Sequence, residues 1–134
     1  EIEYYLTVSR CRDIEPGFYH YAPQDHVLEY LGPLDTLQEQ LLTDARMAMG
    51  GRDFDLLITL TARFQRTAWK YQSIAYALIM KNAGSIYQQM YLVATALHLA
   101  PCALGGGNGD HFAQASGLDY YTEGLVGEFV LSGR

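Results

Sequence analysis

Short runs of β-branched and aromatic residues dominate the first quarter of the chain. Residues 2–8 are rich in Ile, Tyr, Leu, Thr and Val, a composition that favours a β-strand. Two further aromatic and apolar runs, at 17–23 and 26–32, are joined through the turn-forming residues APQD. This arrangement predicts a first strand followed by a β-hairpin.

A helical pattern of apolar residues follows the hairpin. Asp35 is placed to act as an N-cap, and Gln38, three residues later, can complete a capping box. Apolar residues then return on one helical face at Leu37, Leu41, Leu42, Ala45 and Met49. The pair Gly50-Gly51 is expected to end this helix. The apolar and β-branched run at 54–64 predicts a buried strand.

The longest apolar stretch extends from residue 74 to about residue 99. It leaves little polar face, so we expect a long, central and buried helix that is stopped by Pro101. Gly84 lies inside this helix, where glycine costs about 1 kcal/mol relative to alanine, and we expect it to permit close packing. Polar residues interrupt the stretch well short of the roughly 20 apolar residues of a membrane span: Lys81, Asn82, Gln88 and Gln89.

The end of the chain returns to strand-like and loop-like patterns. A short strand and a glycine-rich loop occupy 102–110, Asp110 is expected to cap a short helix that reaches residue 115, and 125–133 predicts a closing strand. The mixture of helix and strand patterns predicts an α+β fold. The length of 134 residues is typical of a single domain with one core, spanning residues 1–134.

Composition and charge narrow the classes of partner. Hydrophobic residues make up 49% and charged residues 18%, which is a globular composition. The formal net charge of -6, without a Lys/Arg cluster, argues against a nucleic-acid groove but leaves local binding of an anionic cofactor open. Cys11 and Cys102 lie far apart and no signal peptide is evident, so we expect reduced thiols and a cytoplasmic protein.

The adjacent residues Lys70 and Tyr71 are the first candidates for chemistry. If the long helix begins near Ser73, Lys70 lies at the positive end of its dipole, and partial burial adds a desolvation penalty. Both effects favour the neutral amine, which can act as a general base beside a tyrosine that relays or donates a proton. The alternative is a surface lysine whose stem packs beside Tyr71 and Trp69.

The sequence GGGNGD at 105–110 is the second candidate. Consecutive glycines allow a backbone to approach a ligand closely, and their amides can face a phosphate or the edge of a planar ring. The sequence fits neither the dinucleotide-binding nor the P-loop fingerprint. The alternative is an ordinary loop with Asn108 and Asp110 as turn and cap residues. The four histidines lack the spacing of a metal site, so no metal centre is expected.

Three segments together resemble one family of enzymes. They are PGFYHYAPQDHVLEYLG, WKYQSIAYALIMKNAGSIYQQMYLVATALHLAPCALGGGNGD and GLDYYTEGLVGEFVLSG. In this order they are similar to the SagB-type, or McbC-like, dehydrogenases of the nitroreductase superfamily. The resemblance covers nearly the whole chain and is more specific for the family than for a substrate.

The resemblance implies a nitroreductase-like α+β fold with an antiparallel-type sheet around the long helix. Family members are homodimers that bind FMN at the subunit interface. Lys70 and Tyr71 match the family's catalytic pair, and Gly105, Gly106 and Gly107 match its flavin-contacting loop. The family's Arg/Ser-rich segment that grips the FMN phosphate would precede Glu1. The chain is therefore expected to be the C-terminal part of the family domain, shortened at its N-terminus.

The resemblance also implies a reaction. Many family members oxidise thiazoline or oxazoline rings in peptides to thiazoles or oxazoles, beside a cyclodehydratase or within peptide-synthetase assemblies. The hypothesis is an azoline dehydrogenase in which Lys70, helped by Tyr71, removes a ring proton and FMN accepts the hydride. The alternatives are an NAD(P)H-dependent nitro or quinone reductase, which would not need Lys70, and a flavin-free degenerate subunit that binds a biosynthetic partner.

Overall fold

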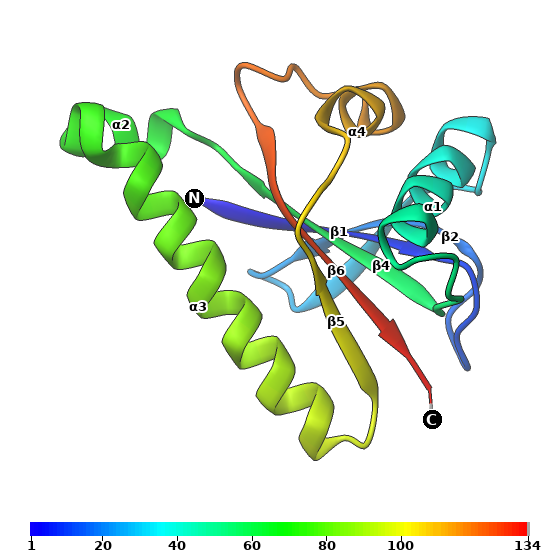
Figure 1. The fold of residues 1–134 in the computed structure, drawn as a ribbon. Coiled ribbons are helices and arrows are strands. Elements are labelled where there is room, and N and C mark those ends of the chain that lie inside the picture. The colour runs from blue at the N-terminus through cyan, green and yellow to red at the C-terminus, as the bar shows by residue number, and fades with distance from the viewer. Residues whose placement is uncertain (134) are drawn as a thin grey trace.

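A twisted, six-stranded antiparallel sheet is the centre of the fold in this computed structural model (Figure 1). The structure describes residues 1–133, and Arg134 lies outside this range. The strand order across the sheet is β3-β2-β1-β4-β6-β5. The strands are β1 (Ile2–Val8), β2 (Gly17–Ala22), β3 (Val27–Gly32), β4 (Leu56–Ala62), β5 (Ala100–Leu104) and β6 (Gly124–Ser132).

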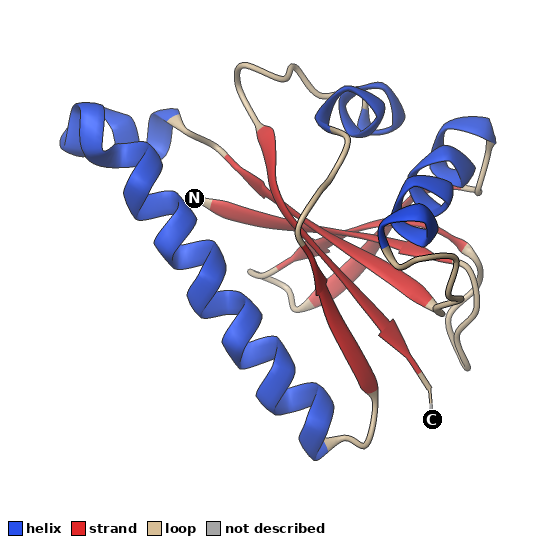
Figure 2. Cartoon of the chain, in the orientation of Figure 1, coloured by secondary structure: helices blue, strands red, loops and turns tan. Residues whose placement is uncertain are grey.

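The helices lie on both sides of this sheet. They are α1 (Thr36–Ala48), α2 (Gln65–Tyr71), the 3-10 turn η1 (Gln72–Ile74), α3 (Ala75–Ala96) and α4 (Gly109–Ser116). Figure 2 shows α1 and α4 together on one side and the long α3 on the other. Side-chain contacts agree: Phe112 of α4 packs edge-on against Tyr5, while Tyr87 and Tyr91 of α3 pack on Phe129. The predicted α+β class and antiparallel sheet are confirmed.

The side of the sheet beneath α1 and α4 holds the main hydrophobic core. Asp35 caps α1 as predicted, because its carboxylate accepts hydrogen bonds from the amides of Leu37 and Gln38, and its own backbone amide donates to the Gln38 side-chain oxygen. The cap fixes the direction in which α1 begins. The inner face of α1 packs on the sheet and on α4 in one cluster of buried residues: Leu41, Leu42, Ala45, Phe54, Leu57, Phe112 and Val130.

The long helix differs from its prediction in both extent and burial. It begins at Ala75 and ends at Ala96, and it is preceded by α2 and η1, for which the sequence predicted no element. The helix is apolar nearly all round, but the sheet meets one stripe of it, so Leu92 and Val93 remain more than half exposed. The prediction of a buried helix is therefore wrong for this chain taken alone. A Cβ built on Gly84 meets nothing within 4 Å, so the expected close packing is not made within the chain either.

The short helix α4 begins earlier than predicted. Asn108, not Asp110, is its N-cap and accepts a hydrogen bond from the amide of His111. Asp110 lies in the first helical turn, where a negative charge is also favourable. Among the described residues, none of the helices is both long and apolar enough to cross a membrane.

Candidate functional site

The glycine loop forms one wall of a pocket at the upper end of the sheet. Residues 105–107 leave the end of β5, and α3 faces them with the side chains of Tyr76, Met80 and Tyr87. Residues 125–127 of β6 complete the lining of a cavity of about 310 Å³. This volume is at the lower end of the range of roughly 300–1,000 Å³ for ligand pockets.

The three glycines of this loop are not equivalent. A Cβ added at Gly107 would lie 2.9 Å from Leu125 Cδ2, closer than real Cβ contacts, and 3.1 Å from Glu128 Cδ, which is tighter than most of them. A Cβ at Gly105 or Gly106 would meet nothing within 4 Å. A side chain at position 107 would therefore displace Leu125 and Glu128, whereas Gly105 and Gly106 leave exposed backbone beside the pocket.

Lys70 and Tyr71 lie in the last turn of α2, so their predicted place at the start of the long helix is wrong. Both side chains are exposed, and Lys70 Nζ lies 5.2 Å from the centroid of the Tyr71 ring. The backbone turns sharply at Gln72 (φ 47°, ψ -125°), which separates α2 from η1. The C-terminal end of a helix is the favourable end for a cation, so the dipole of α2 stabilises the charged amine.

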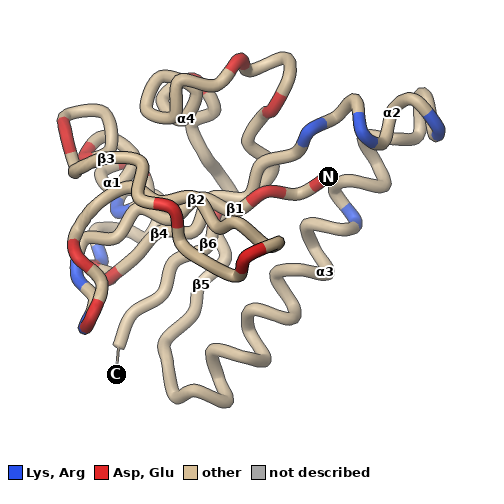
Figure 3. The backbone as a smooth tube through the Cα atoms, turned by 180° about the vertical axis from the view of Figure 1, so that it is seen from behind, with Lys and Arg blue, Asp and Glu red and all other residues tan. Residues whose placement is uncertain are grey.

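The two candidate groups flank the same end of α3 without meeting. α2 leads into the start of α3, and the glycine loop faces Tyr76 and Met80 in its first turns (Figure 1). Neither Lys70 nor Tyr71 is among the described residues that line the pocket. Basic segments lie just before α2, on α2 and in the first part of α3 (Figure 3). One chain therefore supplies both groups, but does not bring them into contact.

The sequence prediction missed the buried acid Glu128. It lies on β6 directly behind Gly107 and is 3% exposed. Burial, together with the charge of Asp44, raises the pKa of Glu128 to about 7. The signal was present in the alternation of β6, because Glu128 shares the core-facing side of the strand with Val130.

A second buried acid, Glu123, attaches the residue before β6 to the neighbouring strands. Glu123 accepts hydrogen bonds from the hydroxyls of Tyr5 and Thr61 and from Arg63 Nε, at 3.2, 2.6 and 2.8 Å. Burial acts to raise the pKa of Glu123, but the bonds from Thr61 and Arg63 outweigh it and hold that pKa below its usual value. This carboxylate is fully paired, so its role is structural.

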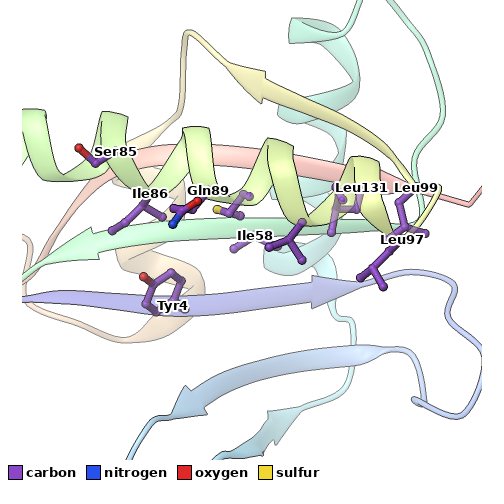
Figure 4. Close-up of a pocket in the computed structure, with 11 residues that line it drawn as sticks. Tyr4, Ile58, Ser85, Ile86, Gln89, Leu97, Leu99 and Leu131 are labelled. Carbon is purple, nitrogen blue, oxygen red and sulfur yellow. The ribbon is translucent and has the colours of Figure 1, made fainter.

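A larger apolar groove lies under α3, away from both candidate groups. It has a volume of about 530 Å³, and Figure 4 shows Tyr4 and Ile58 of the sheet facing Ile86 and Leu97 of the helix across it. A second hollow of about 340 Å³ continues it over β1 and β2. The groove carries no charged side chain among its described lining residues, so it suits packing better than chemistry.

The glycine-loop pocket fits part of an FMN molecule. Backbone at Gly105 and Gly106 and the ring of Tyr76 suit the edge and face of a planar ring system. No Lys or Arg is among the described lining residues, so the pocket offers no charged partner for a phosphate. The residues present match the ring of the cofactor but not its phosphate.

Comparison with known proteins gives a family match over most of the chain. The model described as the nitroreductase family matches residues 17–131. A predicted nitroreductase of Methanocaldococcus jannaschii is 24% identical over 108 residues, which are 78% of this chain and 52% of that protein. The chain spans about half the length of this curated relative.

Solved structures reproduce the fold closely. A predicted nitroreductase from Anabaena variabilis has a TM-score of 0.83 at 26% identity, over 97% of this chain and 26% of that chain. The E. coli microcin synthetase complex McbBCD, solved with truncated pro-MccB17 bound, contains a chain with a TM-score of 0.80 at 23% identity. That match covers 99% of this chain and 52% of the other, and at this identity it is evidence for the fold alone.

Proposed function

The chain belongs to the nitroreductase family, and on that premise we propose that it is an FMN-dependent azoline dehydrogenase. The substrate class is a peptide that carries thiazoline or oxazoline rings, which the enzyme oxidises to thiazoles or oxazoles. We further propose that the chain is the C-terminal part of the family domain. The single observation that carries the proposal is the exposed backbone of Gly105 and Gly106 beside an aromatic-lined pocket.

The glycine loop would hold the ring system of FMN, which supplies the two-electron acceptor when it is bound. Exposed amides at Gly105 and Gly106 can donate to the polar edge of the ring, and Tyr76 offers an aromatic face. The peptide-ring substrate is taken from the resemblance of the three sequence segments, because the likeness to a chain of the microcin synthetase complex bears on the fold alone.

The proton chemistry is assigned to Lys70. Its amine is exposed and held 5.2 Å from the Tyr71 ring, where it can reach a peptide bound across the end of α3. As a base, Lys70 takes the proton from the ring carbon next to the one that loses the hydride, and Tyr71 orients the amine. In the assembled enzyme, a second subunit or the substrate would cover this exposed amine.

A homodimer is the second part of the proposal. Leu92 is exposed on the outer side of α3, Val93 and Leu97 are exposed along the apolar groove, and Gly84 leaves open space on the same helix. Small residues and apolar side chains on one helix suit close packing against a second helix. A partner copy of α3 would also cover α2, and so place Lys70 and Tyr71 in an enclosed site. Such an oxidase would work beside a cyclodehydratase or within a peptide-synthetase assembly.

The test compares the two lysines of the chain. Purified protein is loaded with FMN and assayed for oxidation of a thiazoline-containing peptide by the loss of two mass units. Lys70→Ala should reduce turnover at least ~100-fold, the size of a general-base contribution, and leave the visible flavin spectrum intact. Lys81→Ala, which removes an exposed lysine from α3, should retain activity. Unchanged turnover in Lys70→Ala would remove the base assignment.

A second candidate function is a nitro or quinone reductase that uses NAD(P)H. The name of the curated Methanocaldococcus relative supports it. Such an enzyme would consume nicotinamide rapidly with a nitroarene or quinone, and Lys70→Ala would not slow it. Protein that takes up no FMN under any condition would instead indicate a flavin-free subunit that binds a biosynthetic partner.

A further inference from the structure

The buried carboxyl of Glu128 has no evident structural partner. Its side chain takes part in none of the hydrogen bonds or ion pairs found within residues 1–133, although the residue is 3% exposed. Buried carboxylates are normally paired, because an unpaired charge in a protein interior is costly. The buried carboxylate of Glu123, for comparison, is paired with three hydrogen-bond donors. Glu128 therefore calls for a different explanation.

The carboxyl is in direct contact with the glycine loop. The space that a Cβ of Gly107 would fill lies 3.1 Å from Glu128 Cδ and 3.2 Å from Oε2. The backbone of Gly107 thus rests against the acid, and the other side of the same loop faces the pocket with Tyr76.

The neighbour of Glu128 across the sheet offers an acceptor. Thr59 of β4 is its register partner, so both side chains lie on the same face of the sheet. The Thr59 hydroxyl oxygen is buried and has no hydrogen-bond partner among the described residues. The Thr59 hydroxyl can accept a hydrogen bond from a neutral carboxyl or donate one to a carboxylate, so it offers Glu128 a polar neighbour in either form.

One of the titratable groups around Glu128, Asp44, favours its neutral form. Asp44 faces it from α1, and that carboxylate is bonded to His111 of α4 at 2.6 Å. From the other face, the hydroxyl of Tyr87 on α3 reaches the backbone of Glu128. On β1, the hydroxyl of Tyr5 donates its hydrogen bond to Glu123. Burial and the charge of Asp44 together raise the pKa of Glu128 to about 7.

We propose that Glu128 is a proton-dependent support for the glycine loop. With the carboxyl neutral, the acid packs behind Gly107 and holds residues 105–107 in their pocket-lining position. With the carboxyl charged, the loop moves outward to admit water, and ligand binding at Gly105 and Gly106 weakens. The link to flavin binding rests on the proposed function, whereas the support of the loop does not.

The test follows the loop directly in the full chain. Protein labelled with ¹⁵N-glycine is titrated from pH 5 to pH 8.5, and the amide signals of Gly106 and Gly107 are recorded. The expected result is one transition with a midpoint near 7 that is absent in Glu128→Gln. His111→Gln should keep the transition, which separates Glu128 from the nearby imidazole. Asp44→Asn should move the midpoint to lower pH, because it removes the charge that opposes ionisation.

Two results would overturn the proposal. One is a pair of glycine signals that do not titrate between pH 5 and 8.5, and the other is a transition that persists unchanged in Glu128→Gln. If Glu128→Gln does not fold, the shift of the midpoint in Asp44→Asn decides the matter, and an unshifted midpoint counts against Glu128.

Titration with FMN at pH 6 and pH 8.5 completes the experiment. The wild type should bind FMN at least ~10-fold more weakly at pH 8.5, in line with the population of a group whose pKa is near 7. Glu128→Gln should bind it equally at both values. Absence of FMN binding at either pH, with the glycine transition intact, would refute the flavin proposal and leave the loop support standing. Equal FMN binding by the wild type at both pH values would refute the link between the loop and its ligand.

Discussion

Gly107 shows how a single residue ties the candidate pocket to the core. Its missing side chain lets the loop lie against Leu125 on one side and Glu128 on the other. The neighbouring Gly105 and Gly106 have no such packing constraint. The residue types are identical along this triplet, yet the reason for glycine differs from one position to the next, and it becomes visible when the loop is seen against β6.

This difference predicts a contrast between two alanine substitutions. Gly107→Ala should lower the free energy of unfolding by about 1–3 kcal/mol, because the methyl group overpacks the contact with Leu125 and Glu128. Gly106→Ala should change it by less than about 0.5 kcal/mol, since the added methyl meets open space. Urea denaturation followed by far-UV circular dichroism measures both. Equal losses in the two variants would contradict the packing seen at Gly107.

Lys70 illustrates the opposite case, because its role stays a prediction and the helical setting predicted for it is wrong. The sequence singles it out through its position before an apolar stretch and through the family resemblance. Its actual place at the end of α2 depends on the bend at Gln72, which has a positive φ without being glycine. No residue type near this bend marks it as a helix boundary. Lys70 therefore lies at the negative end of a helix dipole, whereas the sequence predicted the positive end.

At the scale of elements, sequence patterns predicted most where local chemistry decides the structure. β1, the hairpin β2–β3, α1 and β6 were all expected, because alternation, turn residues and the capping box act within a few residues. The separation of α2 and η1 from α3 was not expected, because it depends on contacts with distant elements. The cross-strand pair of Thr59 and Glu128 was also not predicted, because it depends on the register between β4 and β6.

The cap of α1 provides a test at this scale. Asp35→Ala should lower the free energy of unfolding by about 1 kcal/mol, since it leaves the first amides of α1 without an acceptor. Asp35→Asn keeps a side-chain oxygen at the same place and should retain most of the stability. Thermal denaturation of the three proteins compares them. A loss in Asp35→Asn as large as in Asp35→Ala would show that charge, and not capping, stabilises this end of the helix.

At the scale of the whole molecule, the two sides of the sheet are covered unequally. α1 and α4 bury one side, whereas α3 leaves an apolar groove of about 530 Å³ and an apolar outer side on the other. Exposed apolar surfaces of this extent usually mark an interaction site. The expected occupant is a second copy of the chain, as the homodimer proposal requires.

The dimer is tested with two variants, each of which places a negative charge on one side of the molecule. Native mass spectrometry of the wild type should give twice the mass of the chain. Leu92→Asp, on the outer side of α3, should give monomers, because a buried unpaired carboxylate opposes association. Met47→Asp is the matched control, since Met47 is an exposed apolar residue of α1 on the opposite side of the sheet. Dimers that persist in Leu92→Asp, or a monomeric wild type, would contradict the assignment of α3 as the interface.

The strand order has a consequence for the way in which the chain folds. β4 is flanked by β1, from the beginning of the sequence, and by β6, from its end. β1 has both of its neighbours once β4 has formed, whereas β4 completes its hydrogen bonding only when β6 arrives. Pairings of such long sequence separation are formed slowly, because loop closure must precede them. On a ribosome, the hairpin and α1 can form before β6 is made, while β4 keeps an unpaired edge until β6 has left the exit tunnel.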